Sequence, residues 1–233
     1  MVNILLTGSS RGIGAAARAA LIAAGHNVIG QSTSGGDDLI ASDFAQPRAA
    51  DLLWVAALAQ AGGRIDVLVN NAGVFEAADI DDATGFAATW ARSLAINLQA
   101  AADLCRHAVL HFQATGGGRI VNVASRAGHR GDSPDHWHYA AAKGGMIALT
   151  KTIARGYGHQ NIVAYSVAPG FTLTAMAEAY LATPVGAQVI ADTPLGRVAT
   201  ADEVAETVRW LATDAPASLT GATLDINGAS YVR

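Results

Sequence analysis

The chain has 233 residues, of which 51% are hydrophobic and 15% are charged, and this composition excludes a disordered chain. Its 15 lysines and arginines and 19 aspartates and glutamates give a net charge of −4, which argues against a nucleic-acid-binding surface. One cysteine, Cys105, excludes an intrachain disulfide framework, so we expect a cytoplasmic protein with no membrane span and no secretory signal.

Short runs rich in β-branched residues alternate with longer alanine-rich stretches along the chain. The expected strands are residues 2–6, 28–31, 65–70, 120–123, 162–167 and 222–226. The expected helices are residues 15–24, 48–61, 84–114, 138–157 and 201–213. This alternation indicates βαβ units and a parallel sheet covered on both faces. No linker, charge block or repeat marks a second domain, so we expect one domain over residues 1–233.

A glycine-rich turn separates the first strand from the first helix. Gly8, Gly12 and Gly14 stand at a Gly-x3-Gly-x-Gly spacing around Ser10, Arg11 and Ile13. Glycines allow a tight turn there and let backbone N–H groups approach a pyrophosphate at the helix N-terminus. The turn therefore predicts a dinucleotide site, and a plain strand-to-helix turn is the alternative.

Three residues predict acid–base chemistry. Tyr139 and Lys143 are four residues apart, which places them on one face of the expected helix. A tyrosine has a pKa of about 10, and a neighbouring ammonium group favours its anion, so we expect Lys143 to lower the pKa of Tyr139. Ser125 follows the strand at 120–123, at the sheet edge where ligands bind in open α/β folds. It can donate a hydrogen bond to a substrate oxygen beside Tyr139.

These motifs resemble those of the short-chain dehydrogenase/reductase family. The family's TGxxxGxG signature matches Thr7 to Gly14, and its NNAG signature matches Asn70 to Gly73, with Asn71, Ala72 and Gly73 in the cofactor site. Its catalytic serine and YxxxK motif match Ser125, Tyr139 and Lys143. Its helix asparagine resembles Asn97. Its PG turn and following threonines resemble Pro169, Gly170, Thr172 and Thr174.

The resemblance implies a doubly wound Rossmann fold with seven parallel strands and hydride transfer between a nicotinamide cofactor and a carbonyl or secondary alcohol. It assigns Tyr139 as the acid–base group, with Lys143 tuning it and holding the nicotinamide ribose. Ser125 polarises the substrate oxygen, and Asn97 holds a relay water. Thr174 then contacts the carboxamide or the pyrophosphate, and residues 171–193 form a substrate lid that includes Tyr180. The resemblance also implies a homotetramer built through residues 84–114, residues 138–157 and the last strand.

The end of the second strand bears on which nicotinamide cofactor binds. NAD sites usually have an acidic residue there for the ribose 2′-hydroxyl, whereas this chain has Ser32 and Thr33, and Asp37 and Asp38 come later. Arg11 lies in the glycine turn, and a phosphate prefers guanidinium and hydroxyl donors. We therefore expect NADP(H), with NAD(H) possible and a solvated surface arginine as the alternative for Arg11. The Asp43-Phe44 pair resembles the family's adenine-side pair, with a plain loop aspartate as the alternative.

The substrate is less well specified. Residues 194–197 and 220–228 resemble those of 3-oxoacyl-carrier-protein reductases, but Gly116 and Gln160 stand where those enzymes have docking arginines, while Arg119 and Arg155 lie nearby. A small carbonyl or alcohol substrate is therefore our main expectation. The alternatives are a 3-oxoacyl-carrier-protein reductase, an NAD-dependent alcohol or sugar dehydrogenase, and, remotely, a cofactor-binding regulator. We expect no metal site at His136 and His138, and we expect Ser133 and Pro134 to start the helix that carries Tyr139.

Overall fold

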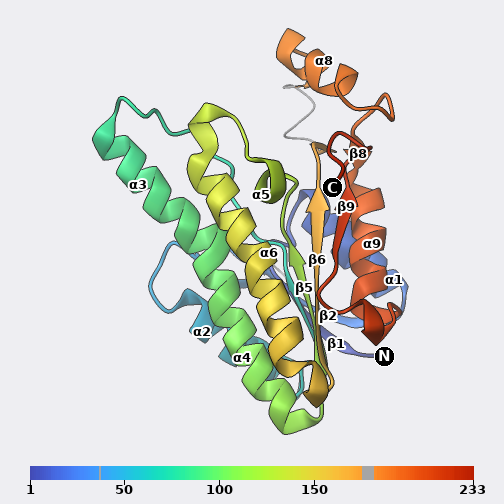
Figure 1. Ribbon diagram of the computed structural model, residues 1–233. Helices are drawn as coiled ribbons and strands as arrows, with labels where there is room; N and C mark the ends of the chain where they lie inside the picture. Colours follow the sequence, from blue (N-terminus) through green and yellow to red (C-terminus); the bar gives the residue numbers. More distant parts are fainter. Residues whose placement is uncertain (37, 175–180) are drawn as a thin grey trace.

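The computed structural model describes residues 1–36, 38–174 and 181–233 (Figure 1). Seven parallel strands form one sheet in the order β3-β2-β1-β4-β5-β6-β9. They are β1 (Asn3–Leu6), β2 (Asn27–Ser32), β3 (Leu39–Ala41), β4 (Val67–Asn70), β5 (Gly118–Val123), β6 (Ile162–Pro169) and β9 (Thr223–Ile226). Two short strands, β7 (Thr172–Leu173) and β8 (Ala199–Thr200), pair separately. The expected doubly wound α/β fold with seven parallel strands is confirmed.

Helices cover both faces of the sheet, as Figure 1 shows. On one face pack α2 (Ala49–Gln60), α4 (Ala100–Thr115) and α6 (Trp137–Tyr157). On the other pack α1 (Gly12–Ala23) and α9 (Ala201–Thr213), the second of which begins with a Thr200–Glu203 capping box. Along β1, Leu5 faces the first layer while Ile4 and Leu6 face the second. Strands buried on both faces therefore have nearly continuous apolar sequences.

The prediction of a single helix over residues 84–114 is wrong. The segment is α3 (Ala83–Leu94), a π-helical turn η1 (Ala95–Gln99) and then α4. In that turn the Ala100 N–H donates to the carbonyl of Ala95, five residues back. The apolar periodicity continues through the turn, so the sequence pattern does not reveal it. Such π turns are rare in proteins, and those that occur often lie at functional sites.

Several short elements were not expected from the sequence. They are β3, β7, β8, α5 (Ala127–Arg130), α8 (Pro184–Ala191) and the 3₁₀ turns η2 (Pro134–His136), η3 (Gly158–Gln160) and η4 (Ala217–Leu219). Ser133 precedes η2, but its hydroxyl contacts Nδ1 of His136 rather than a backbone N–H, and α6 begins only at Trp137. Ser133 and Pro134 nevertheless begin the turn that continues directly into α6, so the prediction that these two residues start this helical segment is confirmed.

The strand order has a switch point where β1 and β4 lie side by side. From β1 the chain continues to β2 and β3 on one side, and from β4 it continues to β5 and β6 on the other. In such sheets ligands bind outside the carboxyl ends of the strands at this switch point. Figure 1 shows α5 and α8 near that end of the sheet. Among the described helices, none has the length and hydropathy of a membrane span.

Candidate active site

The glycine turn after β1 leaves no room for side chains at two positions. Gly8 has a φ of +64°, and a Cβ there would lie 2.7 Å from the Cα of Ala72. A Cβ on Gly14 would collide with the carbonyl oxygen of Gly8. Helix α1 starts at Gly12, and the first N–H groups of a helix have no partner within it. The glycines therefore let the turn pack against its own backbone and the loop after β4, and the N–H groups at the start of α1 suit the pyrophosphate of a dinucleotide.

The loop after β4 is hydrogen-bonded to the glycine turn. Nδ2 of Asn71 donates to the carbonyls of Thr7 and Gly8, at 3.0 Å each. Oγ1 of Thr7 accepts from the backbone N–H groups of Asn71 and Ala72, also at 3.0 Å each. These four bonds join the ends of β1 and β4 into one unit, and they give the Thr7 hydroxyl a role that the sequence did not indicate.

The residues predicted to hold a 2′-phosphate differ in accessibility. Arg11, just before α1, and Thr33 are exposed, whereas Ser32 is 6% exposed and its hydroxyl donates to the carbonyl of Gly35 at 2.9 Å. The Ser9 N–H donates to the Gln31 carbonyl at 2.9 Å, so the glycine turn lies beside the end of β2. Asp38 lies 3.7 Å from the Arg18 guanidinium, and Asp37 lies outside the described residues.

The adenine-side pair has visible structural roles. Oδ1 of Asp43 accepts from the Ala45 N–H at 3.0 Å, which fits the loop-aspartate alternative. The Phe44 side chain is buried in the core layer that packs between the sheet and α2, α4 and α6. An adenine contact by this pair stays a prediction.

The PG turn brings Thr174 to the glycine turn. A Cβ on Gly12 would lie 3.4 Å from Cγ2 of Thr174. Pro169 ends β6, and Oγ1 of Thr172 donates to the Gly170 carbonyl at 3.2 Å. Of the expected lid at 171–193, residues 175–180, including Tyr180, lie outside the described residues.

Ser125 and Tyr139 meet beyond the end of β5. Ser125 follows this strand, and its Oγ accepts from the Ala127 N–H at 3.1 Å. Its side chain also hydrogen-bonds Tyr139, which lies in the first turn of α6. The Phe75 ring packs edge-on against Tyr139 with centroids 4.9 Å apart. The hydroxyls of Ser125 and Tyr139 can therefore share one oxygen atom of a substrate.

Lys143 lies one helical turn beyond Tyr139 and is 3% exposed. Its Nζ donates to the Val123 carbonyl at 2.8 Å and lies 5.7 Å from the centroid of the Tyr139 ring. A Cβ on Gly73 would lie 3.6 Å from this Nζ and 2.7 Å from Oδ1 of Asn97. The fold thus gathers all four predicted catalytic residues in one place.

Burial opposes charge on both titratable groups of this cluster. It raises the pKa of Tyr139 to about 12, although the hydrogen bond with Ser125 favours the anion. It also lowers the pKa of Lys143 to about 8. The expectation that Lys143 would lower the pKa of Tyr139 is therefore wrong for the protein alone, because burial dominates the shift and the Asp132 charge raises the pKa further. Tyr139 is held as a neutral phenol, the form that donates a proton.

The sequence analysis did not identify several buried polar side chains that are hydrogen-bonded at the ends of the strands beneath the site. Oε1 of Gln31 accepts from the Gly8 N–H at 2.8 Å, and its Nε2 donates to the Ser42 carbonyl at 2.7 Å. A buried chain runs from Asn70 to Asn122 to Thr150, with both side-chain bonds at 2.9 Å. Polar residues within otherwise apolar strand ends were the available signal.

Cys105 borders this polar chain. It is 1% exposed and packs in the core as a small buried side chain. Burial raises the pKa of its thiol to about 12.

Aromatic side chains from three segments gather around the start of α6. His136 stacks on Phe75 with centroids 3.8 Å apart, and Phe75 is half exposed. Trp137 is also exposed and packs edge-on against Phe86. In the part of the chain that the structure describes, no three His, Cys, Asp or Glu side chains cluster as a metal would require.

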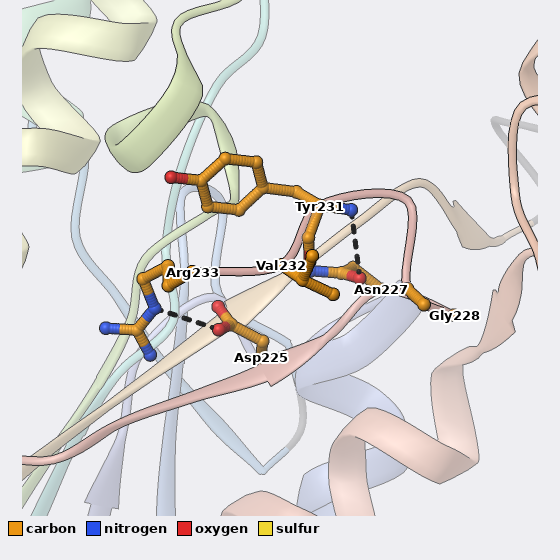
Figure 2. A pocket seen from close by; sticks show the side chains of 7 residues that line it. Asp225, Asn227, Gly228, Tyr231, Val232 and Arg233 are labelled. Atoms are coloured by element: carbon orange, nitrogen blue, oxygen red, sulfur yellow. Dashed lines mark hydrogen bonds and ion pairs between the residues drawn. The ribbon is translucent and has the colours of Figure 1, made fainter.

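A separate hollow of about 420 Å³ lies at the C-terminal tail (Figure 2). Figure 2 shows Asp225 paired with Arg233, at 3.0 Å, and the Tyr231 N–H directed at Asn227. Arg126, next to Ser125, donates to Oγ of Ser230 and holds this tail against the loop after β5. None of the residues lining the hollow belongs to the predicted catalytic group.

Comparison with known proteins agrees with this geometry. A family model described as Enoyl-(Acyl carrier protein) reductase matches residues 8–229. A 3-oxoacyl-[acyl-carrier-protein] reductase of Synechocystis sp. is 37% identical, over 96% of this chain and 94% of the relative. The enzyme of that name from Escherichia coli is 33% identical, over 98% and 96%. A cis-4-hydroxycyclohexanecarboxylate dehydrogenase of Sinomonas cyclohexanicum is 35% identical, over 96% and 94%.

Proposed function

Because this chain belongs to the short-chain dehydrogenase/reductase family of oxidoreductases, we propose that it interconverts a carbonyl and a secondary alcohol with NADP(H), using Tyr139 as the acid–base group. The observation that carries the proposal is the convergence of Ser125, Tyr139, Lys143 and Asn97 beside the glycine turn. The nicotinamide ring of the bound cofactor supplies or accepts the hydride.

The residues of the chain move the proton. In reduction, the Tyr139 phenol donates its proton to the carbonyl oxygen, and the Ser125 hydroxyl donates a hydrogen bond to the same oxygen. Lys143, fixed by the Val123 carbonyl, supplies positive charge beside the phenolate that forms. Asn97 holds the relay to solvent that returns a proton to Tyr139. In oxidation the same groups act in reverse.

We propose NADP(H) rather than NAD(H) because the accessible groups at the end of β2 are hydroxyls and a guanidinium. Arg11 and Thr33 would hold the 2′-phosphate, and the glycine turn and Asn71 would hold the pyrophosphate. Fluorescence titration with NADPH and NADH tests this. Arg11→Ala should weaken NADPH binding about tenfold to hundredfold, the worth of a charge-assisted hydrogen bond, and leave NADH binding unchanged. Arg64→Ala, which removes an exposed arginine paired with Asp66, is the control. Equal affinity for both cofactors would favour the NAD-dependent alternative.

Turnover tests the acid–base role. Tyr139→Phe should lower kcat by about a hundredfold or more, because general acid–base catalysis contributes that much, while NADPH still binds. Tyr157→Phe, at the other end of the same helix, is the control. Normal turnover by Tyr139→Phe would contradict the mechanism. If the unaltered protein turned over none of the carbonyl compounds screened, the result would favour the alternative of a cofactor-binding regulator.

For the substrate, we propose a small free carbonyl or alcohol compound. At the positions where carrier-protein reductases have docking arginines, Gln160 bonds Gln113 at 2.8 Å and Gly116 has no side chain. The nearby Arg119 donates to the carbonyls of Leu211 and Ala215, at 3.3 and 2.8 Å, so its charge is engaged within the fold.

The second candidate is 3-oxoacyl-carrier-protein reduction, which the names of two relatives favour. Comparing kcat/KM for a 3-oxoacyl group on the carrier protein and on a simple thiol separates the two. A strong preference for the carrier protein would support the second candidate.

We further propose a cytoplasmic homotetramer packed through α3, α4, α6 and β9. The single buried cysteine suits a reducing compartment. Light scattering on the purified protein should give four times the mass of the chain, and a monomer mass would contradict the assembly.

A further inference from the structure

A buried polar pair links α3 to the start of α6. Ser93 and His138 are both 0% exposed, and Nδ1 of His138 lies 2.9 Å from Oγ of Ser93. The same hydroxyl oxygen accepts from Nδ2 of Asn97 at 2.9 Å. A hydrogen-bonded chain therefore runs from the residue next to Tyr139, through Ser93, to the predicted relay asparagine.

The Asn97 side chain is fixed from two sides. Its Oδ1 accepts from the Val74 N–H and its Nδ2 donates to the Val74 carbonyl, both at 3.0 Å. The second hydrogen of Nδ2 goes to Ser93. A primary amide has two donor hydrogens, so both are used. Val74 holds Asn97 to the loop after β4, while Ser93 holds it to α3 and, through His138, to α6.

Keeping this pair buried is costly for the fold. The His138 imidazole is fully buried between the Ser93 hydroxyl and the backbone of Glu76, and burial lowers its pKa. Two apolar side chains would fill the same space without the cost of taking a hydroxyl and an imidazole out of water. A buried histidine one residue before Tyr139, bonded toward Asn97, is therefore better explained by positioning than by packing.

We propose that Ser93 and His138 are positioning residues that hold Asn97 and fix it relative to the helix carrying Tyr139. The inference rests on the proposed function, since it assigns the pair to the proton relay of that reaction. Neither side chain touches substrate or cofactor in this role. Both act through Asn97.

The test compares kcat for variants of the pair. Ser93→Ala and His138→Leu should each lower kcat about tenfold or more, the scale expected for a displaced catalytic group, with KM and the NADPH Kd nearly unchanged. His138→Asn, whose amide can occupy the position of Nδ1, should restore most of the loss. The double variant should be no slower than the slower single variant, because both break one chain. Ser166→Ala, which removes an equally buried hydroxyl bonded to Thr223, is the matched control and should keep the kcat of the unaltered protein.

Unchanged kcat in Ser93→Ala and His138→Leu, or an equal loss in Ser166→Ala, would overturn the inference. A second measurement does not depend on turnover. It therefore distinguishes failure of the positioning role from failure of the proposed function. Hydrogen exchange of the Asn97 side-chain amide is followed by NMR, and the signal is assigned through its loss in Asn97→Asp. Exchange should be slow in the unaltered protein and at least tenfold faster in Ser93→Ala. Equal exchange in both would refute the role of Ser93 whether or not the protein turns over.

Discussion

Lys143 carries a positive charge in the protein interior, and replacing it with methionine should change how stability depends on pH. The side chain is 3% exposed and burial lowers its pKa from 10.5 to about 8. Lys143→Met keeps the length of the side chain and removes the charge. The same variant should lose turnover at least about a hundredfold, as expected when an acid–base group loses its charged neighbour.

The size of the effect follows from the two pKa values. Between about pH 8 and 10.5 the unfolded chain binds more protons than the folded protein, so the stability that Lys143 contributes rises with pH through this window. Below pH 8 its burial costs the folded state about 3 kcal/mol, from a shift of about 2.5 at 1.36 kcal/mol per pKa unit. From pH 7 to pH 9 the cost should fall by about 1.3 kcal/mol.

Urea unfolding of the protein without cofactor, at pH 7 and pH 9, measures this change. The free energy of unfolding of Lys143→Met minus that of the unaltered protein should decrease by about 1.3 kcal/mol between the two pH values. Taking the difference cancels the titration of groups that both proteins share, such as Cys105 and Tyr139. Lys151→Met, which removes an exposed lysine from the same helix, is the control and should give a constant difference. A constant difference for Lys143→Met as well would refute the assignment of a destabilised buried cation.

Three further outcomes are expected. Gly14→Ala should abolish NADPH binding in a fluorescence titration, because its Cβ would collide with the carbonyl oxygen of Gly8. Gly156→Ala is the control, since a Cβ there meets no atom of the described residues within 4 Å. It should bind NADPH normally, and its free energy of unfolding in urea should rise by about 0.5–1 kcal/mol. Binding by Gly14→Ala would contradict the role of the glycine turn in cofactor binding. The Cys105 thiol, buried with a pKa of about 12, should react with a thiol reagent at pH 8 only after denaturation, so rapid labelling of the native protein would be inconsistent with its burial. Arg119→Ala should lower the free energy of unfolding by about 2 kcal/mol, because the guanidinium bonds two carbonyls at the end of α9, and an unchanged urea midpoint would show that these bonds are dispensable.

Local spacing predicted the glycine turn and the Tyr139–Lys143 pair, because each lies within one turn of chain and needs no knowledge of the rest of the fold. Local spacing could not predict contacts between residues that are distant in the sequence. Ser93 and His138 are 45 residues apart, and Gln31 acts through the Gly8 N–H, 23 residues away.

Burial depth was equally inaccessible. A four-residue spacing brings an ammonium group near a phenol, but it does not show how far each group is taken out of water, and this burial reversed the expected pKa shift of Tyr139. The π turn was missed because the apolar positions of 84–114 continue through it.

The backbone groups that hold Lys143 and Asn97 belong to a different part of the chain from the turn before α6. Lys143 bonds the carbonyl of Val123, the last residue of β5, and Asn97 bonds the backbone of Val74, just beyond β4. These two strands are neighbours in the sheet, so the proposed relay is anchored to the backbone at and just after the ends of two adjacent strands. The turn before α6 carries His136, which stacks on the exposed Phe75 ring and contributes none of these backbone anchors. Substitutions of His136 should therefore change KM among substrates while leaving proton transfer intact, since loops carried on a rigid scaffold can vary without moving it.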